Sequence, residues 1–191
     1  MPQQPNPNRF VSPFVLRYVA RALLPFYRKI SSNKVYATQW SRAVVNIDTT
    51  EMLRLFRLAS PSVPNPLPGT FKSGYNIYFE FKGPIDIYGV DTLLPPGTIK
   101  RLSQETRAHQ QMAMAIVPLY NALETDPAFA QNMAKAIRSG NTQRAASLVR
   151  RYVTTPELRS VKVEGSGITL AFKFAFSSLT YEHLLYHPIF E

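Results

Sequence analysis

Apolar and polar residues alternate along several segments of the chain, and each alternation predicts a β-strand with one buried face. The clearest segment is 75–82, where four aromatic or branched residues share one face, and a Gly-Pro turn separates it from a second candidate strand at 85–88. Segments 160–164 and 168–176 flank a Gly-Ser-Gly turn and predict a β-hairpin. Residues 34–47 are rich in Val, Tyr, Trp and Thr, so they predict one further strand or two short ones.

Apolar residues spaced three and four positions apart predict helices elsewhere in the chain. Ser12 and Pro13 suit the N-cap and first turn of a helix that extends to about residue 30, with Pro25 kinking or breaking it. Two later helices begin at Pro127 and after Gly140. The remaining predicted helices cover residues 51–58, 98–123 and 180–186.

This order of elements favours an α+β fold over a doubly wound sheet, because neighbouring strands joined by tight turns pair antiparallel. We expect a small antiparallel sheet of about five strands covered by helices, with an amphipathic helix at the N-terminus. Residues 13–191 are predicted to form a single domain. Residues 1–12 are rich in Pro, Gln and Asn, so we expect a flexible tail there.

Composition narrows the class of protein. Of 191 residues, 45% are hydrophobic and 18% are charged, which excludes an intrinsically disordered chain. The absence of cysteine excludes disulfides, thiolate metal sites and cysteine nucleophiles. Arg17 and Arg21 interrupt the best apolar stretch, residues 14–27, so it is typical neither of a signal peptide nor of a membrane span. We therefore expect a cytoplasmic protein, peripheral to a membrane if its first helix binds lipid.

The formal net charge of +10 is concentrated at the N-terminus, where residues 1–34 hold six basic residues and no acidic one. On a helical projection Arg17, Arg21 and Arg28 form a stripe about 40° wide, opposite an apolar face that includes Val19 and Phe26. Such a helix suits an anionic membrane surface or a groove on a protein partner. The competing interpretation is a surface helix whose apolar face packs on its own sheet and whose arginines are solvated.

A second basic region is free of acidic residues from Pro127 to Pro156. Its two helices resemble a helix-turn-helix in outline, but an ordinary helical hairpin has the same pattern. Non-specific attraction to a phosphate polymer needs only charge and stacking groups, so nucleic-acid binding is the alternative function. The residues that would carry it are Lys135, Arg138, Arg144, Arg150 and Arg151.

Catalytic and metal-binding patterns are weaker. His183 and His187 are four positions apart, so on the predicted helix they share a face and are the candidate metal ligands. Ser166 lies between glycines but lacks the frame of a nucleophile elbow. An enzyme of unknown type, with acids such as Glu80, Asp86 and Asp91, is the third possibility, and no cofactor is predicted.

We therefore favour a non-catalytic binding or assembly protein that engages an anionic or apolar partner surface through its N-terminal helix. The residues assigned to this contact are Arg17, Arg21, Arg28, Val19 and Phe26. Self-association is a further possibility, because the strand at 168–176 would offer unpaired backbone groups to a second chain if it formed an edge of the sheet.

Overall fold

The computed structural model describes residues 10–71, 73–93 and 102–188. The α+β fold is confirmed: six helices and six strands are present in these ranges. The helices are α1 (Pro13–Ser32), α2 (Lys34–Val45), α3 (Thr49–Ala59), α4 (Leu102–Thr125), α5 (Pro127–Arg138) and α6 (Thr142–Val149). The strands are β1 (Leu67–Phe71), β2 (Gly74–Glu80), β3 (Ile87–Leu93), β4 (Leu158–Glu164), β5 (Gly167–Phe172) and β6 (Tyr181–Tyr186).

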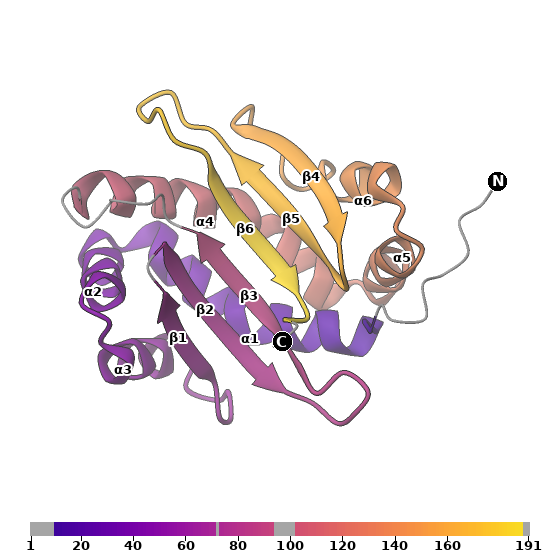
Figure 1. Ribbon diagram of the computed structural model, residues 1–191, viewed down its shortest axis with the longest axis horizontal. Coiled ribbons are helices and arrows are strands. Elements are labelled where there is room, and N and C mark those ends of the chain that lie inside the picture. Colours follow the sequence, from indigo (N-terminus) through magenta and orange to yellow (C-terminus); the bar gives the residue numbers. More distant parts are fainter. Residues whose placement is uncertain (1–9, 72, 94–101, 189–191) are drawn as a thin grey trace.

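The six strands form one open antiparallel sheet in the order β1-β2-β3-β6-β5-β4. Helices α1 and α4 cross one face of this sheet (Figure 1). Helices α2 and α3 lie toward the edge formed by β1, and α5 and α6 lie toward the edge formed by β4. Inward-facing residues such as Tyr75, Val90 and Leu170 join the helices in one hydrophobic core. Among the described residues, no helix covers the opposite face of the sheet (Figure 1).

Helix α1 forms as its sequence indicates and is the central element of the core. The Ser12 side chain accepts a hydrogen bond from the backbone N–H of Val15, and Pro13 occupies the first turn. Pro25 lies inside the helix and does not end it, so of the two expected effects, a kink or a break, the break does not occur. Its ring lies on the exposed side, where the backbone carbonyl that loses its partner can be hydrated.

The predicted strand at 34–47 is wrong, because these residues form α2. Its β-branched and aromatic residues also fit a helical period, since Tyr36, Trp40 and Val44 are four positions apart and all buried. Asn33 caps the helix by accepting a hydrogen bond from the backbone N–H of Tyr36. The tertiary environment therefore outweighs the strand propensity of the individual residues.

The predicted helix at 180–186 is also wrong, because this segment is strand β6. Its buried residues alternate with half-buried ones, and it pairs with both β3 and β5 in the middle of the sheet. The strand predicted at 168–176 stops at Phe172. It lies between β6 and β4, so it is not an edge through which a second chain could pair.

The other predicted elements are confirmed with shifted ends. The strands at 75–82 and 85–88 are β2 and β3, and the hairpin is β4 with β5. The predicted helix at 98–123 is described from Leu102 as α4. Most of the predicted tail lies outside the described residues, but residues 10–12 are packed: Val11 is buried and the backbone N–H of Phe10 donates to Ser166 Oγ.

Candidate functional site

The apolar face of α1 is covered by the protein itself. Val19 and Phe26 are both 0% exposed, and the Phe26 ring contacts the ring of Trp40 with centroids 4.6 Å apart. This corrects their assignment as contacts for a partner, because neither side chain reaches the surface in this fold. Burial in the core explains these two residues instead, since it removes large apolar surfaces from water.

The predicted arginine stripe lies beside the C-terminal half of α4. Arg17 Nε donates to the backbone carbonyl of Glu124 at 3.1 Å, and Arg21 Nε is 3.5 Å from the Glu124 carboxylate. Arg28 donates to Asn121 Oδ1 at 3.1 Å. Arg28 is about 16 Å further along the helix than Arg17, so the structure does not bring all three arginines to one site.

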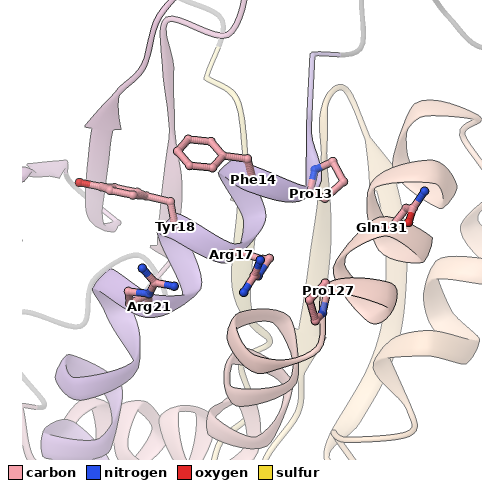
Figure 2. Close-up of a pocket in the computed structure, with 7 residues that line it drawn as sticks. All are labelled: Pro13, Phe14, Arg17, Tyr18, Arg21, Pro127 and Gln131. Atoms are coloured by element: carbon pink, nitrogen blue, oxygen red, sulfur yellow. The ribbon is translucent and has the colours of Figure 1, made fainter.

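A pocket opens where the first turns of α1 meet the start of α5. Its volume is about 370 Å³. Figure 2 shows Phe14 and Tyr18 on the α1 side, Pro127 and Gln131 on the α5 side, and Arg17 between them. The full lining is Pro13, Phe14, Arg17, Tyr18, Arg21, Pro127 and Gln131.

Phe14 is the exposed apolar group of this pocket, with 69% of its surface open. The Tyr18 ring is held more firmly, because it contacts Phe79 and Phe81 edge-on at 5.8 and 5.3 Å between centroids. Phe14 lies 6.4 Å from Tyr18, centroid to centroid. The wall of the pocket formed by Tyr18 is therefore fixed by the core, and the Phe14 ring is exposed at the edge of the pocket.

The charges around the pocket are nearly balanced. Arg17 and Arg21 face Glu124, and Asp126 caps α5 by accepting a hydrogen bond from the backbone N–H of Phe129. Further along α5, Lys135 and Arg138 add two positive charges. These two residues share an exposed face with Pro127 and Gln131, which line the pocket.

The second basic region is confirmed as a helical pair, with Gly140 at φ 64° and Asn141 capping α6. All five predicted cations, Lys135, Arg138, Arg144, Arg150 and Arg151, are exposed. The start of α6 is held against the sheet, because the backbone N–H of Val163 donates to Thr142 Oγ1. The charged surface is therefore present, and the first turn of α6 is exposed, with a hydrogen bond to β4.

The two candidate metal ligands, His183 and His187, do not lie close enough together to bind one metal ion. They lie on and just after strand β6, where a separation of four residues corresponds to about 13 Å. His183 is buried between Tyr120 Oη, 2.8 Å from its Nε2, and Thr92 Oγ1, 3.3 Å from its Nδ1, and burial lowers its pKa to about 3. His187 packs against the Phe10 ring. No cluster of metal-ligating side chains occurs within residues 10–71, 73–93 and 102–188.

Ser166 and Asp91 have structural contacts, whereas Glu80 and Asp86 are exposed. Ser166 accepts from the backbone N–H of Phe10. Asp91 is 8% exposed on the open face of the sheet, where Tyr78 and Tyr186 donate to its two oxygens at 2.6 and 2.8 Å. Burial raises the pKa of Asp91, while the two tyrosine hydrogen bonds act in the opposite direction.

Phe14, Tyr18, Pro127 and Gln131 are pocket residues that were not selected from the sequence. A signal for Phe14 was present, because it falls three residues before Arg17 and seven before Arg21, on the same stripe. Its position on the polar side of the helix places an apolar side chain at the surface. No comparable signal joined α1 to α5, because their proximity arises from tertiary packing.

Comparisons with protein-family models, with curated proteins and with solved structures gave no match to this chain. In the part of the chain that the structure describes, no helix has both the length and the apolar character needed to cross a membrane.

Proposed function

We propose that this is a non-catalytic binding or assembly protein that engages an anionic or apolar partner surface through the exposed side of α1. The observation that carries the proposal is the pocket at the first turns of α1, where exposed Phe14 stands beside Arg17 and Arg21. The proposed compartment is the cytoplasm. Attachment to a membrane would be peripheral.

The geometry supports a localised contact more than insertion of the helix into lipid. A helix that lies in a membrane interface buries its whole apolar face among the acyl chains. In α1 that face is occupied by the protein's own core, and Phe14 is the large apolar side chain that α1 exposes. The partner surface would therefore meet the first turns of α1 and the neighbouring part of α5.

Binding of anionic probes tests this proposal. The probes are vesicles of anionic phospholipid, a glutamate-rich peptide and single-stranded DNA, and the variant is the double change Arg17→Ser/Arg21→Ser. We expect the variant to bind at least one probe about tenfold more weakly, which corresponds to about 1.4 kcal/mol.

The matched control is Arg42→Ser/Arg57→Ser, which removes the same charge from exposed positions on α2 and α3. It should bind within about twofold of the parent, since α2 and α3 lie on the opposite side of the molecule from α5 (Figure 1). Equal weakening by the two double variants, or failure of every probe to bind, would contradict the proposal.

The second candidate function is non-specific binding of a phosphate polymer, favoured by the five exposed cations of residues 127–156. Affinity for single-stranded DNA should then fall steeply with salt. Replacing Arg150 and Arg151 by serine should reduce the log–log salt slope by about 1.4, because each neutralised phosphate of a single strand adds about 0.7 to that slope. An unchanged slope, or no binding at low salt, would exclude this function.

A further inference from the structure

The pocket between α1 and α5 has the size and lining of a site for a single large side chain. Its volume of about 370 Å³ is near the lower end of the range for small-ligand sites, about 300–1,000 Å³. Pro13, Phe14, Tyr18 and Pro127 supply apolar surface, and Tyr18 is fixed by its contacts with the core. An aromatic or aliphatic group would gain most from this lining, because burying it removes apolar surface from water on both sides.

The charge pattern outside the pocket indicates what is attached to that side chain. Beside the pocket, the Arg21 guanidinium is paired with the Glu124 carboxylate, and Asp126 directly precedes Pro127, which lines the pocket. Beyond Gln131 the exposed face of α5 continues with Lys135 and Arg138. The surface is therefore apolar and nearly neutral at the pocket, and positive further along α5.

We propose that the pocket receives an apolar side chain from an acidic peptide segment of a protein partner, whose carboxylates bind Lys135 and Arg138. This inference rests on the proposed function, and it names the partner's chemistry. A continuous polyanion fits less well, because its charges would be repelled by Glu124, which is paired with Arg21, and by Asp126, which adjoins Pro127. A peptide with an uncharged anchor followed by acidic residues matches both parts of the surface.

The helix geometry predicts the spacing of the peptide motif. Lys135 and Arg138 lie about 6 and 10 Å along α5 from Gln131, at about 1.5 Å per residue. An extended peptide advances about 3.3 Å per residue. Acidic residues are therefore expected about two and three positions beyond the point where the peptide leaves the pocket.

A labelled synthetic peptide tests this inference by fluorescence anisotropy. The peptide contains one tryptophan, a short serine spacer and a run of glutamates. Two comparison peptides replace the tryptophan by serine, or the glutamates by lysines. We expect the parent protein to bind the first peptide about tenfold more tightly than either comparison.

Two protein variants separate the two halves of the site. Phe14→Ser should weaken binding of the tryptophan peptide about tenfold and leave binding of the anchor-free peptide unchanged. Lys135→Ser/Arg138→Ser should weaken binding of both glutamate peptides and reduce the salt dependence. The matched control Arg42→Ser/Arg57→Ser should change none of these affinities by more than about twofold, and thermal melting checks that each variant folds.

The outcomes distinguish this inference from the function on which it rests. If the anchor-free peptide binds as tightly as the tryptophan peptide, the pocket inference is overturned, and the proposed function still stands provided that Arg17→Ser/Arg21→Ser weakens binding of an anionic probe. If neither Arg17→Ser/Arg21→Ser nor Lys135→Ser/Arg138→Ser weakens the binding of a glutamate peptide, the peptide inference fails. The proposed function fails with it only if binding of anionic vesicles and of single-stranded DNA is also unchanged in Arg17→Ser/Arg21→Ser. If the protein binds anionic vesicles in a Phe14-dependent way but binds no peptide, the occupant of the pocket is a lipid and the peptide inference is overturned. If the parent protein is an oligomer that dissociates in the Phe14→Ser variant, the occupant is a second copy of the chain and the peptide inference is likewise overturned.

Discussion

Two histidines in the core show how single residues of this protein respond to burial. His109 Nε2 lies 2.6 Å from Tyr75 Oη, and His183 is held between Tyr120 and Thr92. Burial lowers the pKa of each histidine to about 3, well below the usual 6.5. Both are therefore neutral in the folded protein at neutral pH, and they act as polar parts of the core.

These pKa values predict that the protein is less stable in mild acid. Between pH 6.5 and 3 the unfolded chain binds protons at these histidines that the folded protein does not bind, so the free energy of unfolding falls as the pH falls. At about pH 5 the expected decrease is about 2 kcal/mol for each histidine, relative to about pH 7. Urea unfolding at the two pH values measures it.

The variants His109→Gln and His183→Gln should each show a smaller decrease between these two pH values, whatever their absolute stability. His187→Gln, outside the core cluster, is the control and should keep the full pH dependence. An identical pH dependence in all four proteins would show that burial does not hold these histidines neutral.

Among the elements, those whose sequence fits a single type of structure were predicted best. Helix α5 has a clear cap, a helical apolar period and a terminating glycine, and it was predicted almost to the residue. Residues 34–45 fit both a strand by propensity and a helix by period. Strand β6 was mistaken for a helix because its character depends on pairing with β3, which lies far away in the sequence, as well as with β5.

Helix α1 combines a face in the core with an exposed edge, and the two should differ in their effect on stability. Phe26→Ala should cost about 3–5 kcal/mol, because it leaves a cavity among the rings of Tyr27, Trp40 and Phe56. Phe14→Ser should change the free energy of unfolding by less than about 0.5 kcal/mol, because most of that side chain is already in water. Chemical denaturation of the two variants and the parent measures both changes in the free energy of unfolding. Similar costs at both positions would contradict the assignment of a core face and a binding edge on α1.

The prolines inside α1 and α4 give a second prediction for these elements. Pro25 and Pro118 are exposed, and each removes a helical hydrogen bond without a compensating buried contact. Pro25→Ala and Pro118→Ala should each stabilise the protein by about 1–3 kcal/mol. A fall in the thermal midpoint in either variant would show that the proline is required by the shape of its helix.

For the whole molecule, the excess charge could be located from the sequence, but the surface that it forms could not. Six basic residues in the first 34 were visible as a count, and so was the acid-free segment 127–156. The packing of α1 on α4 decides which of these charges lie beside an acidic residue. The position of α5 beside α1 brings the two basic segments together (Figure 1). Contacts between residues so far apart in the chain are not encoded in any local period.

At this scale, the first turns of α1 and the exposed face of α5 are proposed to bind one partner together. Backbone NMR of the labelled protein, titrated with the tryptophan–glutamate peptide, measures this directly. We expect shifted amide signals concentrated in residues 14–21 and 128–138, with saturation at one equivalent. Shifts concentrated on the open face of the sheet or in residues 142–151, with none at α1, would contradict this binding surface.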